Sequence, residues 1–120
     1  MSDNRFPKEN RLVREAEFSR VYDNGFRFDG GSFVFYLLDK DDSNPRIGIV
    51  TPKYVGTAVK RNRVKRLIRE SFRKNKDTFN GLDLIVRPKE NAAGLTNDEL
   101  VERFLTDFRS SRERFCPSDK

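Results

Sequence analysis

One segment constrains the fold of this chain more than any other, because it is apolar on both faces of a predicted strand. Residues 32–40 read SFVFYLLDK, and their aromatic and branched side chains are typical of β-structure. Successive side chains of a strand point to opposite faces of a sheet. One face therefore carries Phe33, Phe35 and Leu37, and the other carries Val34, Tyr36 and Leu38. Neither face is polar, so we expect both faces to be covered by other elements or used for binding.

The rest of the chain supplies elements that could cover this strand. Apolar residues at helical spacing predict a helix over about residues 13–24, which ends at an Asn-Gly pair. Residues 46–51 and 82–86 are predicted strands, and the short polar turn at 40–45 predicts that the first two strands form an antiparallel hairpin. A last helix is predicted to begin at Thr96, with the T-x-x-E spacing of a capping box.

With a basic helix between the second and third strands, the predicted order is α-β-β-α-β-α. A chain of 120 residues is long enough for one hydrophobic core but not for two. We therefore predict a small single-domain α/β sandwich of the α+β class, with a mixed sheet and a β-α-β crossover. The domain would span residues 1–120, with mobile ends at about 1–10 and 114–120.

The sequence also disfavours several kinds of chemistry. It contains no histidine, which excludes Ser-His and Cys-His pairs and histidine metal ligands. Its single cysteine, Cys116, lies beside a proline near the chain end and is a poor candidate nucleophile. The acidic cluster at residues 39–42 would either hold a divalent ion or form an ordinary polar turn, and the turn is the simpler interpretation. We predict no catalytic residue and no metal site in the protein.

The compartment is predicted from two further features. The longest apolar run is too short to span a membrane, and the opening MSDNRFPKENR lacks the apolar stretch of a signal peptide. One cysteine cannot form an internal disulfide. We therefore expect a cytoplasmic protein.

Positive charge is concentrated in one segment. Residues 53–76 contain ten Lys and Arg residues against Glu70 alone, a net charge of +9 in a chain whose total is +6. Like charges four residues apart on a helix destabilise it by a few tenths of a kcal/mol per pair. A localised basic patch of this kind predicts a polyanionic partner.

The basic segment is amphipathic on a helical period. Its apolar face is predicted to carry Val64, Leu67, Ile68, Ser71 and Phe72. Its polar face is predicted to carry Asn62, Arg66, Arg69 and Arg73, with Arg63 and Lys65 at the flanks. A merely solvated face is the alternative, but such faces usually mix Glu with Lys, and here only Arg66 and Glu70 form an attractive pair. Arginine binds phosphate in a bidentate manner, which favours a nucleic acid without choosing between RNA and DNA.

The segment RIGIVTPKYVGTAVKRNRVKRLIRESFR resembles the protein subunit of bacterial ribonuclease P. The hallmark of that family is an A-V-x-R-N-R-x-K-R-x-x-R block after a strand and a K-x-x-G turn. Here the block runs from Ala58 to Arg69, with Lys53 and Gly56 upstream. The opening FPKENRL and the later LDLIVRPK are also similar, so the resemblance spans roughly Phe6 to Phe108.

The resemblance implies that this chain is an accessory subunit of a ribonucleoprotein endonuclease. In that family the RNA subunit is the catalyst, and it uses Mg²⁺ to cleave precursor tRNA and release the mature 5′ end. The implied partners are the catalytic RNA, in a 1:1 complex, and the 5′ leader of precursor tRNA. No cofactor held by the protein itself is expected. The family also has a left-handed crossover around the basic helix, whereas the general rule predicts a right-handed one.

Two sets of residues carry over from the family by position. The set expected to contact the RNA subunit is Arg61, Asn62, Arg63, Lys65, Arg66, Arg69 and Arg73. The set expected to line the leader cleft is Phe18, Tyr22, Val34, Tyr36 and Lys53. Aromatic side chains hold single-stranded RNA by base stacking. Each set keeps an alternative, because Asn62 could merely cap the helix and the helical aromatics could be ordinary core residues.

The turn before the basic helix departs from the family pattern. Pro52 stands where a small polar residue is frequent, and Tyr54 stands where a second lysine is common, which leaves Lys53 as the only charge there. Two other functions compete with the implied one. They are a structural, ribosomal-type RNA-binding protein with no role in catalysis, and a DNA-binding protein whose basic helix enters the major groove.

Overall fold

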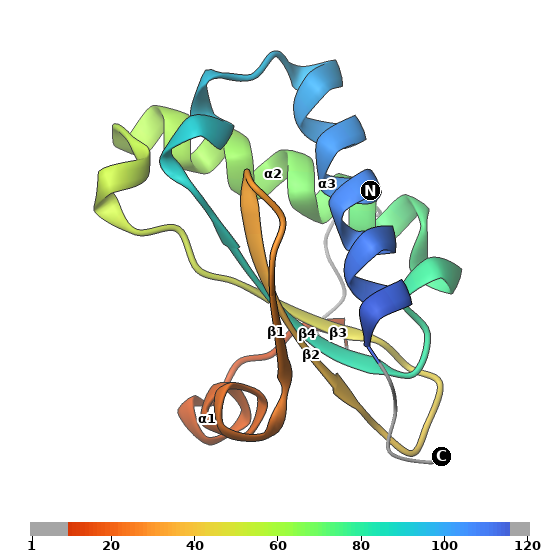
Figure 1. Cartoon of the computed structure of the whole chain (residues 1–120). Helices are drawn as coiled ribbons and strands as arrows, with labels where there is room; N and C mark the ends of the chain where they lie inside the picture. The colour runs from red at the N-terminus through yellow and green to blue at the C-terminus, as the bar shows by residue number, and fades with distance from the viewer. Residues whose placement is uncertain (1–9, 116–120) are drawn as a thin grey trace, which may run out of the picture.

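The computed structural model describes residues 10–115, and the predicted mobile ends lie mostly outside this range. Three α-helices and four strands are present between these two residues, joined in part by short 3-10 turns (Figure 1). The bounds are α1 (Glu15–Asn24), β1 (Phe26–Asp29), β2 (Phe33–Asp39), β3 (Arg46–Ile49), η2 (Lys53–Val55), α2 (Ala58–Lys74), η3 (Lys76–Phe79), β4 (Leu82–Pro88), η4 (Glu90–Gly94) and α3 (Asn97–Arg114).

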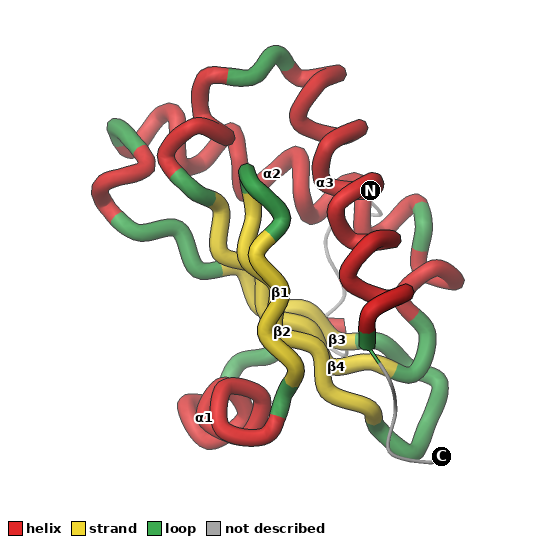
Figure 2. Tube along the Cα trace, in the orientation of Figure 1, coloured by secondary structure: helices red, strands yellow, loops and turns green. Residues whose placement is uncertain are grey.

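The four strands form one mixed sheet in the order β1-β2-β4-β3 (Figure 2). The β1–β2 and β2–β4 pairs are antiparallel, and the β3–β4 pair is parallel. Helix α1 lies on one side of the sheet, and α2 and α3 lie on the other (Figure 1). This arrangement confirms the predicted α+β sandwich, in which helices cover both faces of the central strands.

Strand β1 is an addition to the predicted order. Its four residues, FRFD, alternate between apolar and polar, but the run is too short to stand out in the sequence. Pairing with β2 gives the segment its structure, and the tight turn between the two strands is closed by the Gly30 N–H, which donates to the Phe33 carbonyl at 2.8 Å.

The sequence predicted an antiparallel hairpin between the first two predicted strands, at residues 32–40 and 46–51. These strands are β2 and β3 of the structure, and the prediction is wrong. Strand β4 lies between β2 and β3, so those two strands are not neighbours. The connecting loop instead crosses the start of β4, where the Lys40 N–H donates to the Gly81 carbonyl at 3.0 Å. Because β4 is buried along nearly its whole length and β3 is half-buried at both ends, β4 gains more from the central position.

The main core lies between the sheet and the helix pair α2–α3. We call this side of the sheet the covered face, and its β2 residues Phe33, Phe35 and Leu37 are fully buried. Aromatic rings fill the layer, and the ring centroids of Phe79 in η3 and Phe108 in α3 lie 4.4 Å apart, with the ring planes tilted by 39°. Helix α2 turns its predicted apolar face to this core, and the buried residues of that face are Val64, Leu67, Ile68, Ser71 and Phe72.

The opposite side of the sheet, which we call the open face, is covered only in part by α1. A small second core forms there around Leu12, Val21 and Ile85. The alternate residues of β2 on this face are less buried, since Tyr36 and Leu38 remain half-buried. Both faces of β2 are thus used, as predicted, but they are covered to different extents.

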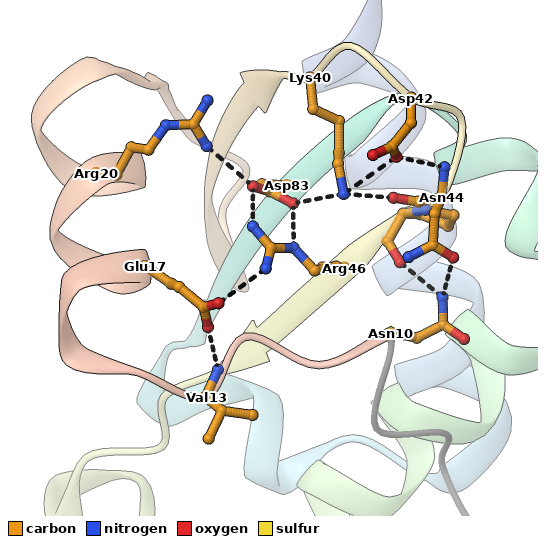
Figure 3. Close-up of polar contacts among 10 residues, drawn as sticks. Asn10, Val13, Glu17, Arg20, Lys40, Asp42, Asn44, Arg46 and Asp83 are labelled. Carbon is orange, nitrogen blue, oxygen red and sulfur yellow. Dashed lines mark hydrogen bonds and ion pairs between the residues drawn. The ribbon is translucent and has the colours of Figure 1, made fainter.

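A buried charge network fixes α1 to the open face (Figure 3). The Asp83 side chain is fully buried and accepts two hydrogen bonds from Arg46, at 2.9 and 2.8 Å. Lys40 and Arg20 lie 3.4 and 3.3 Å from the same carboxylate. The hydrogen bonds to Asp83 are the main cause of a raised pKa for the Arg46 guanidinium, which is therefore charged at every physiological pH.

Glu17 connects this network to the start of α1. Its carboxylate accepts backbone N–H groups from Val13 and Arg14, at 2.8 and 3.0 Å, and it also binds Arg46 at 2.9 Å. The two backbone hydrogen bonds are the main cause of a lowered pKa for the Glu17 carboxyl. The network therefore holds the helix end, the sheet and the incoming chain together.

Candidate nucleic-acid interface

The local sequence fixes how the basic helix α2 begins. Gly56 has a positive φ of 150°, a backbone conformation that side chains disfavour, and the turn that it makes leads into the helix. Thr57 is the N-cap and accepts the Lys60 backbone N–H at 3.3 Å. Asn62 is therefore not the helix cap, which removes that alternative for this exposed side chain.

The seven residues expected to contact an RNA subunit divide into two groups. The first group makes no side-chain hydrogen bond and no ion pair to any residue between 10 and 115. Its members are Asn62, Lys65, Arg69 and Arg73. Because the other side of α2 is buried in the core, these groups are held on a rigid helix with their binding capacity unused. A phosphate-rich partner would satisfy them at little conformational cost.

The second group is engaged within the protein. Arg66 lies 3.7 Å from Glu70, as predicted, and the Arg61 Nε donates to the Gly56 carbonyl at 3.1 Å. Arg63 donates to the Asn97 side chain at 2.8 Å and to the backbone carbonyls of residues 93 and 95. Arg63 thus ties α2 to the η4–α3 connection, a structural role that the sequence pattern did not reveal.

The open face carries the aromatic part of the candidate interface. Tyr22 of α1 and Tyr36 of β2 meet edge to face, with ring centroids 4.8 Å apart. Both rings are half-buried, and Val34 on the same strand face is buried. The two tyrosines pack against the small second core, yet both remain partly exposed. The core and stacking interpretations are therefore compatible here.

Three of the five predicted leader residues, Phe18, Tyr22 and Tyr36, pack against the same small second core on the open face. The Phe18 ring also packs over Gly48 of β3, so that a Cβ there would lie 2.5 Å from the ring. Lys53 is exposed in η2, beside Tyr54, which is 63% exposed. The aromatic leader residues thus lie on one side of the sheet, and Lys53 lies in the η2 turn that precedes α2.

Arg87 is a residue that the sequence analysis missed. It is on β4 opposite Val34, and its guanidinium donates to the Tyr22 hydroxyl oxygen at 2.9 Å. Burial opposes its charge, but this hydrogen bond and the electrostatic effect of Tyr54 and Tyr36 outweigh burial and raise the pKa of Arg87. A signal was present, since Arg87 follows the apolar run Leu84–Val86 and, two positions after Ile85, shares the face of that residue.

The mutual distances of the acidic side chains in the described part of the chain decide whether they can form a metal-binding cluster. Between residues 10 and 115, no three His, Cys, Asp or Glu side chains gather closely enough to hold a metal ion. In the acidic loop, Asp42 accepts the Asn44 backbone N–H at 2.9 Å and lies 3.4 Å from Lys40 (Figure 3). That loop is an ordinary polar turn. None of the described helices combines the length and apolarity that crossing a membrane requires.

Comparison with known proteins identifies the family. A family model described as Ribonuclease P matches residues 6–110 of the chain. The chain belongs to the ribonuclease P protein family. A ribonuclease P protein component from Pseudoalteromonas translucida is 33% identical over 118 residues, which cover 98% of this chain and 84% of that protein. One from Halalkalibacterium halodurans is 39% identical over 95 residues, which cover 78% and 80% of the two chains.

Solved structures of ribonuclease P proteins share the fold. The Staphylococcus aureus protein superposes with a TM-score of 0.80 at 30% identity, over 87% of this chain and 96% of that one. The Thermotoga maritima protein superposes with a TM-score of 0.73 at 28% identity, over 80% and 92% of the two chains. The order of helices and strands along the chain and the mixed sheet are therefore those of the family.

Proposed function

We propose that this chain is the protein component of a ribonuclease P that removes the 5′ leader of precursor tRNA. The single observation that carries the proposal is the row of uncompensated polar and cationic groups on α2, comprising Asn62, Lys65, Arg69 and Arg73. In this proposal the row binds phosphates of the catalytic RNA. Arg61, Arg63 and Arg66 stay in the predicted contact set, although their internal bonds leave them fewer free donors.

The tyrosine pair on the open face is proposed to bind the 5′ leader. Tyr22 and Tyr36 would stack on unpaired bases, and Val34, Phe18 and Lys53 would border the path. Arg87 would add a cation beside the rings, where it can stack on a base or bind the leader backbone. Base stacking on aromatic side chains contributes about 1–3 kcal/mol per base and tolerates most sequences, which suits leaders of varied sequence.

The chemistry is proposed to lie in the RNA subunit. The described residues provide neither a metal-ligand cluster nor an activated nucleophile, so the protein would act by positioning and by charge. The Mg²⁺ of the holoenzyme would be held by the RNA. We further propose a 1:1 complex with that RNA in the cytoplasm.

Reconstitution with the cognate catalytic RNA tests this function. We expect the holoenzyme to cleave precursor tRNA at a lower Mg²⁺ concentration than the RNA alone requires, because protein cations replace part of the metal screening. A structural RNA-binding protein would bind RNA without changing the Mg²⁺ requirement, and a DNA-binding protein would prefer duplex DNA. Either result would contradict the proposal.

A further inference from the structure

A hollow of about 280 Å³ lies along the outer edge of β3, at the border between the open and covered faces. Its apolar wall includes Val13, Phe18 and Ile49, and Arg11 and Arg69 provide its cationic side chains. It therefore joins Phe18, which was predicted to belong to the leader cleft, to Arg69, which was predicted to contact the RNA subunit. The two predicted interfaces meet at this edge.

The backbone around Arg11 is firmly placed. The neighbouring Asn10 side chain is buried and donates to the Pro45 carbonyl at 2.8 Å and to the Asn44 side chain at 3.0 Å (Figure 3). On the other side, the Leu12 N–H donates to the Ile47 carbonyl of β3 at 3.0 Å. Arg11 thus extends from a segment that runs along the sheet edge, and its exposed side chain starts from a fixed position.

The charges of the hollow are not compensated by any residue between 10 and 115. Neither Arg11 nor Arg69 has a side-chain hydrogen bond or ion pair with any described residue, and no acidic side chain lines the hollow. Two guanidinium groups beside one cavity repel each other unless an anion lies between them. Arginine forks match the geometry of phosphate oxygens, so a phosphate is the anion that this pair fits.

The volume of the hollow and its apolar wall further limit which phosphate-containing ligands can bind there. The hollow is slightly smaller than the range of about 300–1,000 Å³ typical of pockets that enclose drug-sized ligands. A phosphate with one base or ribose against Phe18, Val13 and Ile49 fits this space. A base can enter only if it is unpaired, because side chains reach little of a base within a regular RNA helix.

We propose that this hollow binds one unpaired RNA nucleotide, whose phosphate lies between Arg11 and Arg69. The proposal rests on the proposed function and adds to it a connection around the β3 edge between the two RNA-binding surfaces. The nucleotide belongs either to the RNA subunit or to the precursor leader, and its chemistry is the same in both cases.

Charge-neutral variants test the shared phosphate. Arg11→Gln, Arg69→Gln and the double variant would be compared with Arg109→Gln, which removes one charge from an exposed position on α3. We expect each single variant to weaken holoenzyme assembly or precursor binding about fivefold or more. If both arginines hold one phosphate, the double variant loses less than the product of the single losses, and the salt slope falls by only about 0.7–0.9.

The two assays distinguish the source of the nucleotide. If the variants weaken binding of the RNA subunit but not of precursor tRNA, the nucleotide belongs to the RNA subunit. If they weaken binding of precursor tRNA only, with mature tRNA unaffected, the nucleotide belongs to the leader. A photo-crosslinker on Val13→Cys, in a Cys116→Ser background, would then map the contacted nucleotide. The proposal is overturned if the Arg11 and Arg69 variants bind like Arg109→Gln in both assays. It is also overturned if the affinity loss of the double variant equals the product of the single losses and its salt slope changes by twice the expected amount. If the holoenzyme reconstituted with those variants still cleaves precursor tRNA at a lowered Mg²⁺ concentration, the proposed function remains, and it then depends on the other groups of the α2 row.

Discussion

The two faces of β2 show how one strand can serve both stability and binding. On the covered face, Phe33 and Phe35 are fully buried under α2 and α3. On the open face, Tyr36 alternates with them along the same strand, yet it remains half-buried because α1 covers only part of that side. The covered face is packed with rings that have no polar atom, whereas the open face carries tyrosines and Arg87. The difference indicates that incomplete covering leaves room for a ligand.

The largest expected effect is on the covered face. Phe35→Ala should lower the free energy of unfolding by about 3–5 kcal/mol, because it leaves a cavity in the aromatic core. Tyr36→Ala, one residue further along but on the open face, should cost clearly less, since part of its ring already contacts solvent. Urea unfolding of both variants checks the comparison. Equal losses would mean that the open face is an ordinary core.

The next largest effect should come from the charge network that holds α1 on the open face. Asp83→Ala should destabilise the fold by about 3 kcal/mol, because it leaves the buried end of Arg46 without its partner. The matched control is the double variant Asp83→Leu/Arg46→Met, which removes both charges and should recover much of the loss. If the double variant is as unstable as the single one, packing rather than charge explains the effect.

Tyr36→Ala should affect binding more than folding. We expect affinity of the holoenzyme for precursor tRNA to fall about 5- to 150-fold, the range given by the loss of stacking on one base, while mature tRNA binds as before. Tyr36→Phe is the control, since it keeps the ring and should bind nearly normally. Equal losses for both tRNA forms would place Tyr36 outside the leader path.

Within α2, a structural arginine can be separated from a binding one. Arg63→Gln should lower stability by about 1–2 kcal/mol, because it removes charge-assisted hydrogen bonds to the η4–α3 connection. Arg73→Gln should leave stability unchanged but reduce the salt dependence of RNA-subunit binding by about 0.7–0.9 in slope. Thermal unfolding and binding titrations at several salt concentrations measure both. If instead Arg73→Gln lowers stability and Arg63→Gln changes the salt dependence, Arg73 is the structural arginine and Arg63 the binding one.

Local patterns predicted the helices well, because their signals lie within a few residues. The capping box at Thr96 and Glu99 starts α3 as expected, and the buried stripe of α2 is the one that helical spacing predicted. The long apolar segment was correctly predicted as a strand. Each of these features depends on neighbours along the chain, which the sequence displays directly.

Strand pairing and the engaged arginines could not be predicted in the same way. The position of β4 between β2 and β3 depends on competition among strands for the centre of the sheet, which a short loop at residues 40–45 does not decide. Likewise, the sequence predicted both Arg63, at the flank of the polar face, and Arg73, on that face, to contact the RNA subunit. Only the approach of the η4–α3 connection, more than thirty residues later in the chain, gives Arg63 internal partners.

The smallest expected effect concerns one acidic side chain of α3, whose partial burial on the covered side lowers the stability of the fold. Asp107 of α3 packs against the turn between β1 and β2, and its Oδ2 is buried with no hydrogen-bond partner. Burial is the main cause of a raised pKa for its carboxyl, so folding disfavours the charged form. The wild-type protein therefore loses stability as the pH rises from below the ordinary value of 3.8 through the raised pKa, and the loss is constant above it.

Asp107→Asn should remove this loss. Relative to wild type, the variant should gain stability over that pH window and keep a gain of less than about 1 kcal/mol at neutral pH, since the residue is only partly buried. Unfolding free energies measured from acid to neutral pH would show the gain growing with pH. A gain that is independent of pH would point instead to better packing by the amide, because only the loss of a titrating group makes the difference depend on pH.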